Sequence, residues 1–412
     1  MQPQIILYII LGIITFDFVL EQVLDYINLK ASNSTVPPEI SSFYNEEKYR
    51  KSLEYKKTLT RFSFLTSSFS FIISFLILSL GGFGYLDTLL RPYFDNEVWL
   101  SLAYFGLMYV VSDVINIPFQ WYSTFVIDER FGFNKTTPKT FIIDKIKGYV
   151  LTAVVGGVLI GLLLYLILNI GAEFWLYFWG VAALFIFGAN MFYTSLILPL
   201  FNKLTPLEDG DLKSAIKNYS ATVNFPLDNI FVIDGSKRSN KANAFFSGIG
   251  KKKKIVLYDT LINNHTTDEL VAVLAHEVGH FKKKHIVLSF ILSILQVGVM
   301  LYVMSLMIYN ENLSLALGAE QLGIHLNLLA FGMLYSPISK LLGIAMNVLS
   351  RKNEFEADAY AAETYNGEAL GTALKKLSVD NLSNLYPHPA YVFVNYSHPP
   401  LLTRLAAIKK AA

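Results

Sequence analysis

The sequence His276-Glu277-Val278-Gly279-His280 stands just before an apolar run, 286–309, and together they decide which fold this chain can adopt. In the pattern H-E-x-x-H on a helix, the two histidines lie four residues apart on one face, where both imidazoles can bind one metal ion. Glu277 stands beside them as the group that moves protons. The apolar run is long enough to cross a bilayer. The sequence therefore predicts a hydrolytic zinc site at the end of a transmembrane helix.

The same stretch predicts where the metal lies relative to the bilayer. If one helix continues from the motif into the run, only six residues, or about 9 Å, separate His280 from position 286. We therefore expect the metal at or just inside the membrane surface.

A catalytic zinc site needs a third protein ligand, and a carboxylate often supplies it while the fourth position stays open for water. Glu354 is the best candidate. Asp358 lies four residues later on the same helical face, where it can accept a hydrogen bond from the distal nitrogen of a ligating histidine. Glu356 points elsewhere, about 160° from Asp358 around the helix. The alternative for this acidic cluster is a solvated helix start.

The composition is that of a membrane protein. Of the 412 residues, 53% are hydrophobic and only 16% are charged, whereas about 25% charged is usual in a soluble domain. The net charge of +2 implies no nucleic-acid partner. The chain has no cysteine, which excludes disulfides, thiolate zinc ligands and a cysteine nucleophile.

Seven apolar segments have about the 20 residues that a spanning helix needs. They are 4–26, 62–83, 98–119, 149–170, 174–199, 286–309 and 322–349. The first lacks a basic start and an evident cleavage site, so we expect a retained helix rather than a signal peptide. Basic residues concentrate in the links after the first, third and fifth segments, which predicts that these links are cytoplasmic. The sixth and seventh segments then form a hairpin that brings the motif and Glu354 to the same cytoplasmic side.

Several of these segments contain ionisable side chains, which in lipid usually face a bundle interior or a water-filled cavity. Asp17, Glu21 and Asp25 form an acidic stripe in the first segment, and Lys340 lies in the seventh. One interpretation is a hydrated chamber. The alternative is that these groups lie near the interfaces or pair between helices.

Residues 202–285 form a hydrophilic insert of mixed structure. We expect a helix over 212–223, a strand over 229–234, a strand pair over 243–248 and 254–258, and an N-cap at Thr266 or Thr267. An extended substrate can add to a sheet edge through main-chain hydrogen bonds. We assign that substrate-binding role to Asn243, Ala244, Phe245 and Phe246. The alternative is a purely structural hairpin.

The predicted organisation has four regions. Residues 1–200 hold transmembrane helices one to five, and 201–285 hold the cytoplasmic insert with the strand hairpin and the metal-binding helix. Residues 286–349 hold helices six and seven, and 350–412 form a cytoplasmic C-terminal region with the third zinc ligand. The fold class is mainly α: a polytopic membrane protein with a small α+β metalloprotease cap.

The residues also support a family resemblance. The chain resembles the integral-membrane type I CaaX prenyl proteases. The matching stretches are the motif 276–280, 351–361 (RKNEFEADAYA), 396–405 (YSHPPLLTRL), 239–246 (SNKANAFF) and 118–135 (PFQWYSTFVIDERFGFNK).

The resemblance implies one Zn²⁺ per chain, seven helices closed around a large chamber, and active-site roles for His398 and Arg404. It also implies removal of the last three residues of a prenylated, cysteine-containing C-terminus, with membrane lipids as the surroundings. In this interpretation His276, His280 and Glu354 hold the zinc, Glu277 is the general base, and His398 and Arg404 donate hydrogen bonds to the oxyanion.

Two other functions fit parts of the sequence. One is a quality-control protease of the same chemistry with broad membrane substrates, prenylated or not. The other is a channel or transporter with a structural metal, which an open fourth zinc position argues against. The expected location is a multi-pass position in a bacterial inner membrane or the endoplasmic reticulum, with the active site facing the cytoplasm.

Overall fold

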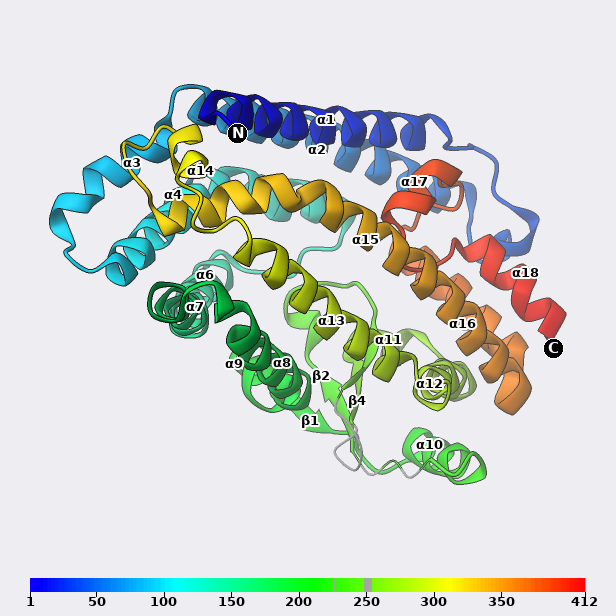
Figure 1. Ribbon diagram of the computed structural model, residues 1–412. Coiled ribbons are helices and arrows are strands. Elements are labelled where there is room, and N and C mark those ends of the chain that lie inside the picture. Colours follow the sequence, from blue (N-terminus) through cyan, green and yellow to red (C-terminus); the bar gives the residue numbers. More distant parts are fainter. Residues whose placement is uncertain (226, 228, 248–253, 412) are drawn as a thin grey trace.

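The protein is built mainly from helices, and a computed structural model describes residues 1–225, 227, 229–247 and 254–411 (Figure 1). The helices are α1 (Pro3–Lys30), α2 (Glu46–Ser79), α3 (Gly82–Leu90), α4 (Glu97–Tyr122), α5 (Glu129–Phe131), α6 (Pro138–Leu151), α7 (Gly157–Ile170), α8 (Phe174–Phe192), α9 (Leu198–Phe201), α10 (Asp211–Thr222), α11 (Asp259–Asn264), α12 (Thr267–Lys282), α13 (His285–Ser305), α14 (Glu311–Ala316), α15 (Ile324–Ala361), α16 (Gly367–Asp380), α17 (Pro389–Asn395) and α18 (Leu401–Ala411).

The chain is a polytopic membrane protein, but seven separate spans stay a prediction. Among the described residues, six helical stretches are long and apolar enough to cross a bilayer. The fourth and fifth expected spans both lie in one of these stretches, Pro138–Phe201. That stretch is interrupted at Gly171, whose φ of +79° is a backbone conformation that favours glycine.

Charged side chains inside the spans pair between helices. Lys340 of α15 lies 3.2 Å from Asp17 and 2.8 Å from Glu21, both on α1. An open cavity of about 640 Å³ between α1, α7, α8, α13 and α15 is lined in part by Asp17 and Lys340. Helix α1 runs beside α2 and α15 (Figure 1). The interhelix pairing considered as an alternative is therefore present, and the single large chamber stays a prediction.

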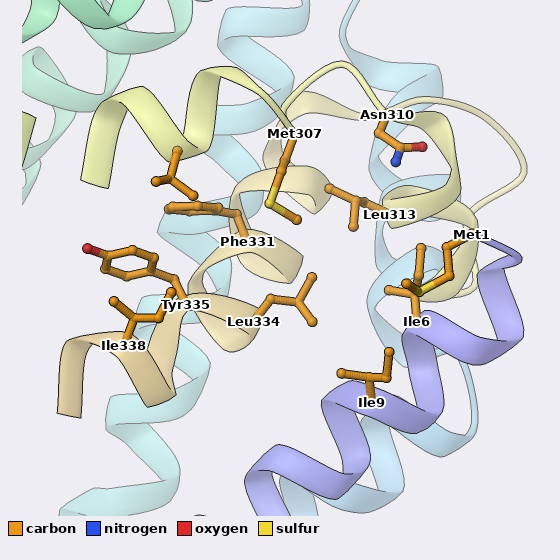
Figure 2. Close-up of a pocket in the computed structure, with 11 residues that line it drawn as sticks. Met1, Ile6, Ile9, Met307, Asn310, Leu313, Phe331, Leu334, Tyr335 and Ile338 are labelled. Carbon is orange, nitrogen blue, oxygen red and sulfur yellow. The ribbon is translucent and has the colours of Figure 1, made fainter. Parts of the chain in front are cut away.

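The beginning of α1 is joined to the hairpin of α13 and α15 by apolar contacts. Figure 2 shows a pocket of about 270 Å³ in which Ile6 and Ile9 of α1 face Leu334 and Ile338 of α15. Close by, Ile6, Ile10 and Leu326 are buried in one cluster. This packing fixes α1 along α15 and so holds the acidic stripe opposite Lys340.

A mixed sheet of four strands, within the part of the chain described, lies at the base of the molecule. The strands are β1 (Leu204–Pro206), β2 (Ile230–Ile233), β3 (Ala244–Ser247) and β4 (Lys254–Tyr258), in the order β1-β2-β4-β3. The expected pair β3 and β4 is antiparallel, with Phe245 opposite Val256. Positions 248–253, which include the end of the first expected strand, lie outside the described residues. Strand β1 was not predicted, because three residues ending in a proline carry too little pattern.

The metal-motif helix and the next span are two helices rather than one. Helix α12 ends at Lys282 and α13 begins at His285. Between them Lys284 has φ +60° and ψ +24°, the left-handed conformation that non-glycine residues seldom adopt. Helices α12, α16 and α18 gather at one end of the molecule, whereas α3 and α14 lie at the other (Figure 1).

Candidate active site

Local sequence fixes where the metal-motif helix begins. Thr266 caps α12 by accepting a hydrogen bond from the backbone N–H of Glu269, whose side chain in turn accepts from the backbone of Thr266. Apolar residues from Leu270 to Ala275, and Val278, are buried against the sheet and α10. Helix α12 is therefore held firmly from its first turn to the motif.

Gly279 allows α12 to approach α15 closely. A Cβ atom added at this glycine would lie 3.1 Å from the Cα atom of Ala357 and 3.2 Å from its carbonyl oxygen. Contacts of this length are tighter than normal packing, so a larger residue would push the helices apart. The glycine in the motif thus brings the histidines of α12 against Glu354 of α15.

Three side chains meet between these helices. The Nε2 atoms of His276 and His280 lie 3.2 Å apart. Glu354 places Oε2 3.5 Å from Nε2 of His276 and Oε1 3.3 Å from Nε2 of His280. Ligands of a tetrahedral zinc ion, at 2.0–2.2 Å from the metal, lie about 3.3–3.6 Å from one another. The spacing of the three ligand atoms therefore fits a zinc ion.

The carboxylate of Glu354 supports this fit independently. Its Oε2 atom is buried and, within the described residues, has no hydrogen bond of acceptable geometry, although Nδ1 of His398 lies 2.9 Å away and Nη1 of Arg404 lies 3.3 Å away. A buried carboxylate oxygen without a proper donor is costly. A cation between His276, His280 and Glu354 would remove that cost.

The other nitrogen of His276 is held by a buried ion pair. Nδ1 of His276 lies 2.9 Å from Oδ1 of Asp358. Arg404 of α18 donates to both oxygens of that carboxylate, from Nε at 2.8 Å and from Nη2 at 2.6 Å. Burial disfavours the charge of Arg404, but the contact with Asp358 outweighs it and raises the pKa of the guanidinium. Arg404 also approaches two of the three clustered residues directly, with Nη2 3.4 Å from Nδ1 of His276 and Nη1 3.3 Å from Oε2 of Glu354.

His398 and Glu277 lie on the accessible side of the site. The side chain of His398 is two-thirds exposed, unlike that of Arg404. Its contact with Glu354 raises the pKa of His398, and the charge of Glu277 adds to this in a smaller way. Glu277 is half-buried, with its negative charge close enough to act on both His398 and Arg404.

The four residues of the predicted substrate strand lie at the sheet edge next to this site. Asn243 lines a cavity of about 580 Å³ together with His398 and Arg404. Phe245 and Phe246 face opposite sides of the sheet and pack into two different apolar clusters. The side chains of these phenylalanines are thus used for packing, and only the backbone of β3 is offered at the edge.

Sequence reasoning missed two residues beside the metal ligands. Nδ1 of His280 lies 3.1 Å from Nδ1 of His285, and Nε2 of His285 lies 3.1 Å from Oε2 of Glu356. In an unbroken helix His280 and His285 would be about 140° apart. The sequence feature that could have pointed to this contact is His285 itself, a third histidine five residues after the motif. It approaches His280 only because the helix breaks at Lys284.

Comparison with known proteins gives consistent matches. Residues 25–203 match the family model described as "CAAX prenyl protease N-terminal, five membrane helices", and residues 206–412 match peptidase family M48. The chain belongs to the CAAX prenyl protease branch of peptidase family M48. It is therefore a membrane-embedded metallopeptidase.

Relatives cover nearly the whole chain. "Probable CAAX prenyl protease 1" of Schizosaccharomyces pombe is 36% identical over 388 residues, which are 90% of this chain and 82% of that protein. The "CAAX prenyl protease 1 homolog" of Arabidopsis thaliana is also 36% identical, over 97% of this chain and 96% of its own length.

A solved structure has the same fold. The crystal structure of S. mikatae Ste24p matches with a TM-score of 0.92 and 33% identity, covering 98% of this chain and 99% of that one. The family membership thus extends to the whole architecture, both membrane helices and cap.

Proposed function

We propose that this chain is a zinc endopeptidase that cleaves prenylated CaaX-type peptides near their C-terminus. The observation that carries the proposal is the meeting of His276, His280 and Glu354 at zinc-ligand spacing, in a member of a peptidase family. The names of the relatives support the CaaX substrate class. The family is one of peptidases, which disfavours a channel with a structural metal.

Each residue near the site has a separate proposed role. His276, His280 and Glu354 hold the zinc, which when bound supplies Lewis acidity that activates water and polarises a carbonyl group. Glu277 accepts the proton from the attacking water and returns it to the leaving amine. His398, the accessible donor, stabilises the oxyanion. Arg404 is held by Asp358, so we assign it mainly to positioning His276 through that carboxylate.

The substrate is proposed to extend β3. Tyr258 donates its backbone N–H to the carbonyl of Asn243, so positions 243, 245 and 247 face β4. Because this direction alternates along a strand, the backbone groups of Ala244 and Phe246 face the other way. The N–H of Ala244 is already bonded to the side chain of Asn243. The C=O of Ala244 and both backbone groups of Phe246 therefore remain for a peptide.

The proposal places the active site on the cytoplasmic side of a host membrane. One basic link predicted to be cytoplasmic lies between the first two expected spans and includes the connection from α1 to α2. In Figure 1 this connection lies at the same end of the molecule as α12, the helix with the H-E-x-x-H motif. Membrane lipids surround the spans, and no nucleic acid takes part.

The test uses the purified full-length chain. We expect one zinc per chain by elemental analysis, cleavage of a farnesylated CaaX peptide in preference to its unmodified form, loss of cleavage with a chelator and recovery with added zinc. Equal cleavage of unmodified, unrelated membrane peptides would instead favour a broad quality-control protease. Absence of zinc from active protein would overturn the metal assignment.

Glu277→Gln separates proton transfer from metal binding. Loss of a general base typically costs about 10²–10⁴-fold in rate, and Gln is the same size as Glu. We expect kcat for the farnesylated peptide to fall by about that factor while the zinc content stays at the wild-type level. A variant that cleaves at the wild-type rate would contradict the role of Glu277.

A further inference from the structure

Two metal-site histidines are supported in different ways. His276 is held by the buried Asp358 and Arg404. The support for His280 comes from a different pair, His285 at the start of α13 and Glu356 of α15. We infer that His285 and Glu356 form a hydrogen-bonded relay that orients His280 for metal binding, with His285 as the positioning residue.

Metal binding at His280 would set the direction of every hydrogen bond in this relay. Nε2 of His280 faces Nε2 of His276, 3.2 Å away, so a metal ion held by both histidines would bind His280 through Nε2. The hydrogen of a neutral His280 is then on Nδ1, which donates to Nδ1 of His285. His285 in turn carries its hydrogen on Nε2 and donates to the carboxylate of Glu356. Each nitrogen has one role, and the chain ends on a negative charge.

His285 does not itself reach the metal. It contacts the nitrogen of His280 opposite the one that faces His276 and Glu354, and the two rings lie 5.2 Å apart between centroids at 72°. His285 is 5% exposed, so both of its nitrogens need protein partners. His280 and Glu356 supply these partners. A ligating histidine generally passes its second N–H to such an acceptor, which fixes its tautomer and ring orientation.

The backbone is shaped to make this contact. In an unbroken helix, residues five apart lie on different faces. The left-handed Lys284 ends α12 and restarts the chain as α13, which brings His285 against His280. Strained backbone at a site is commonly retained because the site needs it. The helix break thus links the first residue of a membrane span to a metal ligand.

The inference rests on the proposed metal role of His280, and the experiment separates the two. Metal-free full-length protein is titrated with zinc in competition with a chromophoric chelator, and the cobalt-substituted protein is examined by visible absorption. We expect His285→Ala to weaken zinc affinity by about 10–100-fold, the usual cost of losing such a support. We also expect it to change the cobalt spectrum.

Substitution of the buried His285 could disturb folding, so variants of Glu356, which is 40% exposed, provide a second test of the relay. Glu356→Ala should weaken zinc binding, whereas Glu356→Gln, which keeps an acceptor oxygen, should restore most of it. The double variant H285A/E356A should be no weaker than His285→Ala alone, because both act in series on His280. Fully additive losses would overturn the relay.

His265 provides a matched control. It is a buried histidine of the same cap, with its nitrogens 3.0 Å and 3.4 Å from the backbone carbonyls of Leu261 and Ala373. His265→Gln should leave zinc affinity and the cobalt spectrum unchanged. If wild type binds zinc and the His285 and Glu356 variants bind it equally well, the relay is wrong. If wild type binds no zinc, the metal site itself is wrong.

Discussion

Exposure distinguishes the residue proposed to act on the substrate from the residue proposed to position a metal ligand. His398 is largely exposed and Arg404 is buried, although both contact Glu354. Arg404 makes a two-pronged contact with Asp358, whose partner is His276. Removal of an arginine from such a buried ion pair lowers the stability of the fold more than removal of an exposed histidine does.

Substitution of these two residues should therefore give different outcomes. His398→Ala should lower kcat by about 10²–10³-fold, as loss of an oxyanion donor does, with little change in Tm. Arg404→Leu removes the cation from a buried ion pair and leaves Asp358 with His276 as its partner; breaking such a pair typically costs about 3–5 kcal/mol of stability, so both Tm and activity should fall. Thermal unfolding and peptide kinetics measure the two effects. Equal losses of Tm in both variants would contradict this division.

At the scale of elements, the site depends on how closely two helices pack. Helix α12 carries two of the proposed metal ligands and α15 carries the third, so a small change in the separation of these helices moves the three side chains apart. Gly279 sets that separation through its contact with Ala357. Strand β3 pairs with β4, and Asn243, directly before β3, lines the cavity that His398 also lines.

Gly279→Ala tests the packing of α12 on α15. The added methyl group overfills the contact, which typically costs about 1–3 kcal/mol, and we expect both lower Tm and weaker zinc binding. Gly343 of α15 is a matched control, because an added Cβ there meets no described atom within 4 Å. Gly343→Ala should preserve zinc binding. Unchanged zinc affinity in Gly279→Ala would show that the helix separation is not limiting.

Main-chain pairing with β3 predicts a periodic response of the substrate. Only alternate residues of an added strand point their N–H and C=O groups at the edge. Methylation of successive amide nitrogens along a substrate peptide should raise KM at every second position, by about 5–10-fold for each lost hydrogen bond. A uniform effect at all positions would argue for recognition through side chains instead.

Much of the site follows from helical spacing in the sequence, and the parts that do not follow have a common cause. The i, i+4 spacing places His276 and His280 on one face, and Glu354 with Asp358 on another. The roles suggested for His285 and Glu356 could not be predicted from the sequence, because they depend on the left-handed backbone of Lys284. A left-handed residue is usually predicted from a glycine, and position 284 is a lysine. The pairing of Asp17 with Lys340 was also undecided, since the sequence does not specify which helices are neighbours.

For the whole molecule, orientation in the membrane is the main property left to establish. The absence of cysteine from the chain makes this accessible, since any introduced thiol is unique. Ser41→Cys, in the link after α1, should react with a membrane-impermeant maleimide only from the cytoplasmic side. Asp95→Cys, between α3 and α4, should react only from the other side; both positions are exposed. Reversed labelling in sealed vesicles would invert the proposed topology.

The length of α15 bears on where a substrate would be cleaved relative to the membrane. Helix α15 is 38 residues long, or about 57 Å, whereas the hydrocarbon layer is about 30 Å thick. Helix α15 is thus long enough to cross the hydrocarbon layer and to extend beyond it, and Glu354 lies near its C-terminal end. If Glu354 holds the catalytic metal as proposed, the depth of α15 in the bilayer fixes the distance between the cleavage site and the membrane surface.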